Sequence, residues 1–229
     1  SVITANCPAT ANYKASSAQY TLTVNAGTIS ASASTKKLAY TGNEQSCANV
    51  TVTTPASGAT ITYSTSQNGT YSITAPKLTN GGSQTVWYKV NAANYNEASG
   101  SYKCTMAQIT LSAASGSTNY PNNKTFTAST NNGGTLSVSP TSGDVVATAS
   151  INNGTVTVTP KKTGTQTITV SATANGDYAA VSTTYTLTVN AGTITHTPDP
   201  LPGNSKEWDG TALTCNGGIT GKTPNNATI

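Results

Sequence analysis

The sequence predicts an all-β protein made of tandem β-sandwiches in an elongated array, and an internal repeat is the main reason. A ten-residue stretch, residues 20–29, recurs letter for letter as residues 185–194. It begins Tyr-Thr-Leu-Thr-Val, in which apolar and polar residues alternate as in a strand with one buried face. Asn-Ala-Gly-Thr then interrupts the alternation. We interpret the stretch as the last strand of one β-domain, a short linker and the first strand of the next.

Three tyrosine pairs give the length of the repeat. The members of each pair are seven positions apart, and successive pairs begin 82 and 83 positions apart: Tyr13 and Tyr20, Tyr95 and Tyr102, Tyr178 and Tyr185. A period of this length is too long for a solenoid repeat or a propeller blade and suits a small β-sandwich.

The period divides the chain into four parts. Residues 1–27 carry the closing hairpin of a module, 28–106 and 107–192 are two complete modules, and 193–229 open a further one. In the first complete module we expect strands at residues 28–33, 48–53, 59–65, 70–74, 84–92 and 101–106. Almost no linker separates the two modules, so we expect a stiff junction, and we expect the chain to be a piece of a longer protein.

The composition excludes several classes of function. Charged residues make up 8% of the chain, and the net charge of +4 comes from eleven scattered lysines, no arginine and seven acidic residues. Nucleic-acid recognition favours clustered basic residues and arginine, so we expect no nucleic-acid partner. No apolar run approaches the length of about 18 residues that a membrane span requires, and no membrane insertion is expected in this segment.

No arrangement of residues points to catalysis or to a metal or other cofactor. The single histidine, His196, cannot form a catalytic or zinc cluster alone, and no motif holds a carboxylate pair. Asp144 and Asp177 lie in Gly-containing turns, where turn formation is a simpler role than calcium binding. We therefore expect no enzyme, no metal site and no cofactor.

The cysteines suggest one disulfide. In the module 28–106, Cys47 and Cys104 stand where the module 107–192 has the large apolar residues Phe126 and Leu187. A paired exchange of this kind suggests two core positions in contact, and therefore a Cys47–Cys104 bond. The alternative is two independently buried thiols. Cys7 and Cys215 remain without an assigned partner.

Residues 107–192 resemble the group 2 bacterial immunoglobulin-like domain of intimin- and invasin-type surface proteins and of some phage virion proteins. The resemblance is carried by residues 145–148, 153–158 and 164–170 and by the closing Tyr-Thr-Leu-Thr-Val. Residues 28–106 are similar to a related Gly-rich sandwich repeat. The resemblance implies immunoglobulin-like sandwiches outside the cell, on a bacterial surface or a phage virion, that act as stalk or adhesive modules beside neighbouring modules of the same parent chain. The family has no common catalytic motif.

Two functions fit these expectations. The first is a structural spacer or stalk. The second is an adhesin that binds a host-surface glycan or protein through an exposed aromatic patch, with Trp87, Tyr63, Tyr71 and Tyr88 as candidate contacts. Trp208 is a further aromatic candidate. Core anchoring is the competing role for these side chains, because either face of residues 85–90 is apolar enough to be inside.

The two ends of the chain match complementary halves of a module. Residues 208–215 parallel residues 40–47, and residues 227–229 repeat residues 59–61, both at an offset of 168. In head-to-tail self-association, the tail of one chain would complete a sandwich with the head of another, with Cys7 and Cys215 as candidates for an interchain link. The alternative is that both ends are remnants of a longer repeat array.

Overall fold

The computed structural model describes residues 1–193, and every regular element in this range is a β-strand. Because this range contains no helix, it contains none that could cross a membrane. The chain divides into two compact units, Ser1–Met106 and Ala107–Ile229. The all-β class expected from the alternating Thr-rich segments is confirmed.

The first unit begins with a two-stranded hairpin made of β1 (Val2–Cys7) and β2 (Ser16–Thr21). The strands are antiparallel, and Ile3 lies opposite Tyr20. Every residue of both strands is exposed, so the hairpin is held by its own ladder of hydrogen bonds and not by a core.

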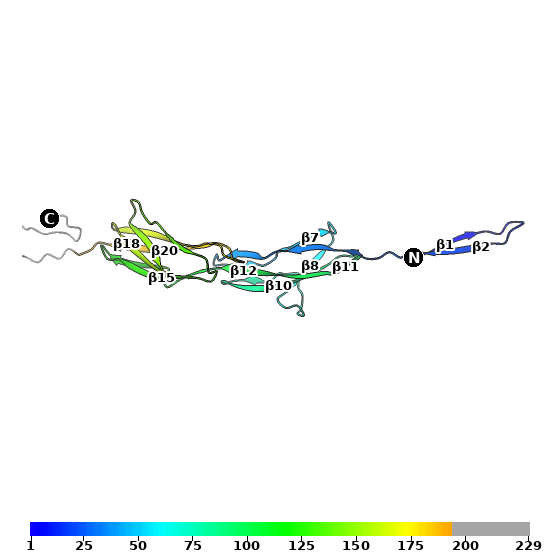
Figure 1. The fold of residues 1–229 in the computed structure, drawn as a ribbon, viewed down its shortest axis with the longest axis horizontal. Coiled ribbons are helices and arrows are strands. Elements are labelled where there is room, and N and C mark those ends of the chain that lie inside the picture. Colours follow the sequence, from blue (N-terminus) through cyan, green and yellow to red (C-terminus); the bar gives the residue numbers. More distant parts are fainter. Residues whose placement is uncertain (194–229) are drawn as a thin grey trace, which may run out of the picture. The chain divides into compact units, whose positions relative to one another are not determined.

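The rest of the first unit is a sandwich with one main sheet, in the order β5-β12-β10-β8. Opposed to it are the short pairs β4-β7 and β6-β9, and β3 runs parallel to β11. Figure 1 shows β7 on one side of the sandwich and β10 and β12 on the other. The strands are β3 (Gly27–Thr28), β4 (Ser30–Ala33), β5 (Lys36–Ala39), β6 (Gln45–Ser46), β7 (Val50–Thr54), β8 (Thr60–Ser64), β9 (Lys77–Leu78), β10 (Gly82–Asn91), β11 (Tyr95–Asn96) and β12 (Ala98–Ala107).

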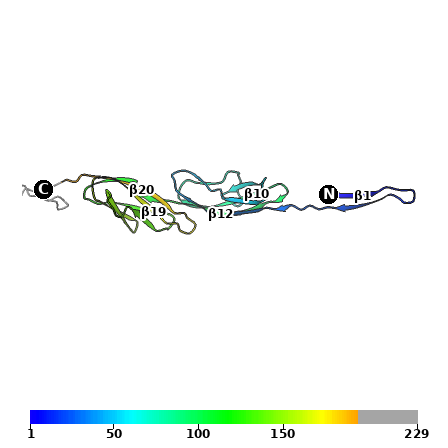
Figure 2. The ribbon, with the colours of Figure 1, turned by 90° about the horizontal axis from the view of Figure 1, so that it is seen from above.

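Alternation along the two long strands builds the core of this sandwich. In β10, Val86, Tyr88 and Val90 point inward, while in β12 Tyr102 and Cys104 do so. These strands run antiparallel over nearly their whole length (Figure 2). One strand expected at residues 70–74 is absent, because this segment makes only a single bridge, between Tyr63 and Ser72.

The described part of the second unit is a more regular sandwich of two four-stranded sheets. Their orders are β13-β15-β18-β17 and β14-β20-β19-β16, and β14 runs parallel to β20. The strands are β13 (Ile109–Leu111), β14 (Ser115–Asn119), β15 (Lys124–Thr130), β16 (Leu136–Ser139), β17 (Ala147–Asn152), β18 (Thr155–Pro160), β19 (Gly164–Ala172) and β20 (Val181–Asn190).

The inward faces of these two sheets form the second core. Tyr185 and Leu187 of β20 are fully buried, as are Ile168 and Val170 of the neighbouring strand β19. Phe126 of β15 stacks on the Tyr185 ring, with the ring centroids 4.0 Å apart. Two packed sheets whose strands are otherwise antiparallel, with an early strand paired in parallel with the last strand of its own sheet, form an immunoglobulin-like sandwich.

Candidate functional site

The four candidate contact aromatics do not share one surface. Tyr63 and Tyr88 lie in the core with exposed fractions of 8% and 7%, whereas Trp87 and Tyr71 are partly exposed. The alternation of β10 separates Trp87 from Tyr88, because Tyr88 follows Val86 inward and Trp87 therefore points outward. The expectation of a common patch of all four is thus wrong, and Trp87 and Tyr71 remain as candidates.

Trp87 and Tyr71 line a hollow of about 440 Å³ on the outer side of the main sheet. Strands β10 and β12 supply one part of its wall, the loop after β8 supplies another, and Glu97 lies between β11 and β12. The lining residues are Gln67, Asn68, Tyr71, Trp87, Lys89, Glu97, Ser99 and Gly100.

Short contacts hold the loop side of the hollow in place. Tyr63 and Ser72 exchange backbone hydrogen bonds of 2.7 and 2.9 Å, which bring the chain back beside β8. The Tyr71 hydroxyl donates to the Gln67 carbonyl at 2.9 Å. Lys89 Nζ lies 5.2 Å from the centroid of the Tyr71 ring, within the range of a cation–π contact.

The charges at the hollow balance each other. Lys89 Nζ and the Glu97 carboxylate form an ion pair of 3.0 Å. The hydrogen bond from Lys89 lowers the pKa of Glu97, and a further one from Asn91 acts in the same direction. The hollow therefore combines a partly exposed indole ring with hydrogen-bond donors and acceptors and has no net charge.

Most of this lining was missed by reasoning from the sequence. The alternation of residues 84–92 places Trp87 and Lys89 on one face, so it could have predicted that these two side chains line the same surface. The participation of Gln67, Asn68 and Glu97 depends on how two loops fold, and no periodic pattern encodes that.

A second feature of the first sandwich is a disulfide between Cys47 and Cys104. Their Cα atoms are 5.7 Å apart, within the range that a disulfide spans, and both residues are fully buried. The bond ties the segment after β6 to the closing strand β12. Phe126 and Leu187, which the sequence comparison sets opposite these two cysteines, are also buried.

Several polar contacts fix the segment that carries Cys47. The Tyr102 hydroxyl donates to the Cys47 carbonyl at 2.6 Å, and the Cys47 amide donates to the Pro76 carbonyl at 2.9 Å. Burial raises the pKa of Tyr102 to about 12, with a smaller contribution from Tyr63.

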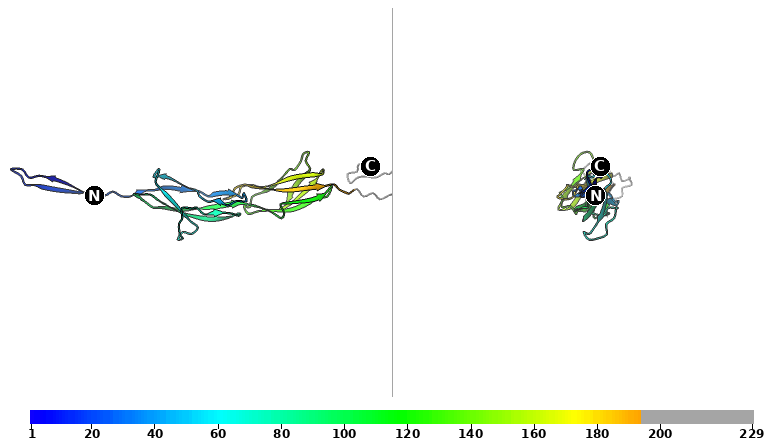
Figure 3. Two further views of the ribbon diagram at one scale, coloured as in Figure 1. Left: turned by 180° about the vertical axis from the view of Figure 1, so that it is seen from behind. Right: turned by 90° about the vertical axis from the view of Figure 1, so that its right-hand side faces the viewer.

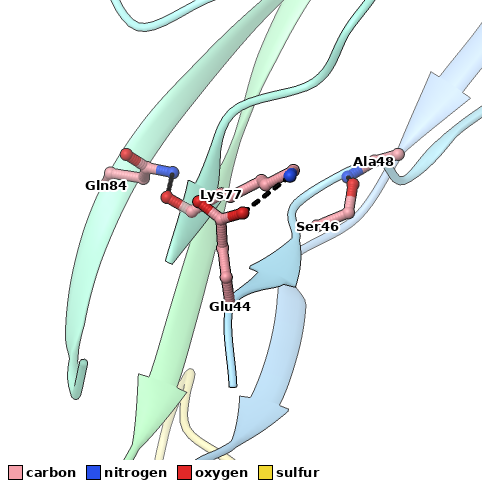
Figure 4. A network of polar contacts seen from close by, with 5 residues as sticks. All are labelled: Glu44, Ser46, Ala48, Lys77 and Gln84. Atoms are coloured by element: carbon pink, nitrogen blue, oxygen red, sulfur yellow. Dashed lines mark hydrogen bonds and ion pairs between the residues drawn. The ribbon is translucent and has the colours of Figure 1, made fainter. Parts of the chain in front are cut away.

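A polar network lies beside this segment (Figure 4). Lys77 forms an ion pair of 2.6 Å with Glu44, and the Gln84 amide donates to the Lys77 carbonyl at 3.5 Å. Both ionic side chains are about half exposed, so the pair contributes little to stability. Its main effect is to help position strands β6 and β9.

Within residues 1–193, no three side chains of the metal-binding types His, Cys, Asp and Glu lie close enough together to hold a metal ion. Asp144 instead forms an exposed ion pair of 2.8 Å with Lys162, which lowers the pKa of Asp144. Cys7 is exposed and carries a free thiol. The remaining candidates, His196, Trp208 and Cys215, lie outside the described residues.

Comparison with known proteins yields similarity in fold only. No family model matches the sequence, and no curated protein matches it. Among solved structures, the chain is similar to an endo-fucoidan hydrolase of glycoside hydrolase family 107 (12% identity, TM-score 0.28, 84% of this chain and 34% of the other). It is also similar to immunoglobulin domains 1–4 of Sidekick-1 (12%, 0.32, 79% and 55%) and to the insect immune protein hemolin (11%, 0.33, 82% and 56%).

The chain spans between about a third and just over half of the length of these proteins. At such TM-scores the matches add no argument about function. The strand pairing of each unit is therefore the basis for the fold: the chain is an all-β protein of immunoglobulin-like sandwiches.

Proposed function

We propose that this chain is a structural spacer, a stalk segment of tandem immunoglobulin-like modules in an extracellular surface protein or virion appendage. The observation that carries the proposal is the division of the aromatic candidates. Tyr63 and Tyr88 stabilise the core of the sandwich, so the four aromatics form no broad patch for adhesion. The partners of a spacer are the neighbouring modules of the same parent chain.

The buried Cys47–Cys104 bond supports a location outside the cytoplasm. Disulfides persist in oxidising compartments and on the surfaces of cells and virions, whereas cytosolic thiols are kept reduced. The resemblance of residues 107–192 to group 2 bacterial domains favours a bacterial surface protein or a phage fibre as the parent.

Small-angle X-ray scattering tests the spacer. A compact globule of 229 residues has a radius of gyration of about 17 Å. Sandwich modules with long axes of about 30–40 Å, arranged in a row, give a clearly larger radius and an extended distance distribution. The scattering is extrapolated to zero concentration so that association does not contribute. A globular profile contradicts the proposal.

The hollow at Trp87 favours a second candidate function, an adhesin module that binds a saccharide. A pyranose ring has an apolar C–H face that packs on an indole ring, and its hydroxyls exchange hydrogen bonds with groups such as Glu97, Lys89 and Ser99. The balanced Lys89–Glu97 pair suits an uncharged sugar better than an acidic one.

A glycan array separates the two functions. An adhesin binds at least one neutral glycan, and Trp87→Ala abolishes this binding. Thr85→Ala is the matched control, because Thr85 is exposed on the same face of β10 but does not line the hollow. A spacer binds no glycan on the array.

A further inference from the structure

The β1–β2 hairpin has the same register as the closing hairpins of both sandwiches. Ile3 lies opposite Tyr20, as Ile168 lies opposite Tyr185. In the first sandwich, Val86 of β10 lies opposite the equivalent tyrosine of β12. The turns agree as well, since the isolated bridge between residues 10 and 13 corresponds to the one between residues 175 and 178. The hairpin is therefore built as the last two strands of a sandwich.

The same residues have opposite exposures in the two copies. Tyr20 and Leu22 are 65% and 42% exposed, whereas their identical counterparts in β20, Tyr185 and Leu187, are fully buried. Figure 3 shows the hairpin as a bare two-stranded ribbon. One face of it thus lacks the cover that a sandwich supplies, and we call this the hairpin face: Ile3, Ala5, Cys7, Tyr20, Leu22 and Val24.

We propose that the hairpin face binds the opening strands of an immunoglobulin-like module, and that residues 193–229 of a second copy of this chain supply them. The sequence of this segment identifies it as the partner. At the offset of 168, Trp208 and Cys215 match Tyr40 and Cys47, and residues 227–229 repeat residues 59–61. The segment lies outside the described residues, and the match is one of sequence.

Such a composite would contain most of one sandwich. Residues 193–194 match residues 28–29 in the exact repeat, and residues 208–229 match residues 40–61 at the offset of 168. In the first unit, residues 28–61 hold β4 to β7 and the first two residues of β8. The hairpin corresponds to β10 and β12. The composite therefore lacks most of β8, together with β9. In the main sheet β8 is an edge strand that pairs only with β10, so its loss leaves the pairing of β5, β12 and β10 intact.

The composite also lacks the equivalents of Tyr63 and Ala75, two members of the core. The donated strands would therefore be held less tightly in the composite than the equivalent strands are held within a complete module. Association of the chain should be reversible and dependent on concentration.

The geometry of the first unit indicates that this association is not covalent. Cys215 corresponds to Cys47, whose sulfur lies 3.2 Å from the Gln84 amide near the start of β10. Cys7 corresponds by register to Val90, six residues further along the same strand, or about 20 Å away. A Cys7–Cys215 link, which the count of unassigned cysteines suggests, does not fit the composite.

Sedimentation velocity of the full chain over a concentration series tests the proposal. The native chain should form head-to-tail oligomers whose average mass rises with concentration. Leu22→Asp and Tyr20→Ser should each lower the association constant by roughly tenfold or more, because each places a polar group on the hairpin face. Thr21→Asp is the matched control on the opposite face and should associate normally. Since the hairpin strands are exposed throughout, none of these variants should change the melting temperature of the sandwiches.

Two further variants test the named partner. Deletion of residues 204–229 should abolish association, and Cys7→Ala should leave it unchanged. A native chain that stays monomeric at all concentrations overturns the proposal. So does association that survives Leu22→Asp. Association that requires Leu22 but survives the deletion excludes residues 204–229 as the partner and indicates pairing between two hairpins.

Discussion

Tyr102 and Tyr185 occupy equivalent positions in the closing strands of the two sandwiches, yet their hydroxyl groups differ in hydrogen bonding. Tyr102 donates to the buried Cys47 carbonyl. The Tyr185 hydroxyl is buried and has no hydrogen-bond partner within residues 1–193. An unpaired buried hydroxyl reduces stability, whereas a satisfied one contributes modestly to it.

Replacing each of these tyrosines by phenylalanine should therefore have opposite effects. We expect Tyr102→Phe to lower the free energy of unfolding of the first unit by about 1–2 kcal/mol, because it leaves the Cys47 carbonyl without its donor. Tyr185→Phe should leave the second unit unchanged or stabilise it by up to about 1 kcal/mol. Urea unfolding of both variants measures the difference, and equal losses would contradict this expectation.

Tyr102 also predicts how stability depends on pH. Its pKa of about 12 lies above the value of about 10 for an unfolded tyrosine, so the folded state keeps a proton that the unfolded state loses. The contribution is fully present below about pH 10 and is lost between about pH 10 and about pH 12. We expect the unfolding free energy to fall over this range, and to fall less steeply in Tyr102→Phe. Tyr63 and Tyr185, whose pKa values burial also raises, account for part of the slope that remains.

Sequence alone predicts the chemical character of a residue better than the direction of its side chain. In residues 85–90 an aromatic ring lies on each face, because Trp87 alternates with Tyr88. The aromatic residues by themselves therefore do not tell which face is inside. Val86 and Val90 share the face of Tyr88, Lys89 shares the face of Trp87, and the structure buries the face that holds the valines.

At the scale of elements, the Cys47–Cys104 disulfide links an early segment to β12 and closes a loop with a sequence separation of 57. In the chain-entropy account, a loop of this length stabilises the folded state by up to about 4 kcal/mol. The first sandwich has short outer strand pairs, with strands of two to five residues, so it depends on this link more than the regular second sandwich would.

We expect the double variant Cys47→Ala/Cys104→Ala to lose about 2–4 kcal/mol of unfolding free energy in the first unit only. Cys7→Ala is the matched control and should have no effect, because Cys7 is exposed and free. Peptide mapping of the unreduced protein should recover a linked Cys47–Cys104 pair. Quantitative alkylation of both thiols without a reductant would contradict the bond.

Strands with sustained alternation are predictable from the sequence, as residues 84–92 and the strand β10 illustrate. Short elements are less predictable. Residues 70–74 resemble a strand but form a single bridge, because no neighbouring strand offers them a ladder. The strand β5, which contains Lys36 and Lys37, was not expected, since its place at the edge of the main sheet arises from pairing with β12 and not from its composition.

At the scale of the whole molecule, the repeat period is the strongest signal in the sequence, because three tyrosine pairs spread along the chain share it. The division into four parts that it implies stays a prediction. The hollow at Trp87 was not predictable at any scale, because loops that share no pattern supply half of its lining.

The connection between the two sandwiches is short. The strand β12 ends at Ala107 and β13 begins at Ile109, so Gln108 alone separates the strands. Its backbone amide donates to Asn131 Oδ1 at 2.8 Å, and its carbonyl accepts from the Thr130 hydroxyl at 3.2 Å. Gln108 belongs to the second unit, and both of its backbone groups are bound within that unit.

The stiff junction expected from the near absence of a linker in the sequence stays a prediction, and it implies that the two units tumble as one body. ¹⁵N relaxation should give similar rotational correlation times for both units, measured in the Leu22→Asp background so that association does not contribute. Insertion of a flexible Gly-Ser linker of about six residues after Ala107 should separate the two values and shorten both, because each unit then reorients with less drag from the other. Independent tumbling without the insertion would show that the junction bends, and the spacer would then be a flexible tether.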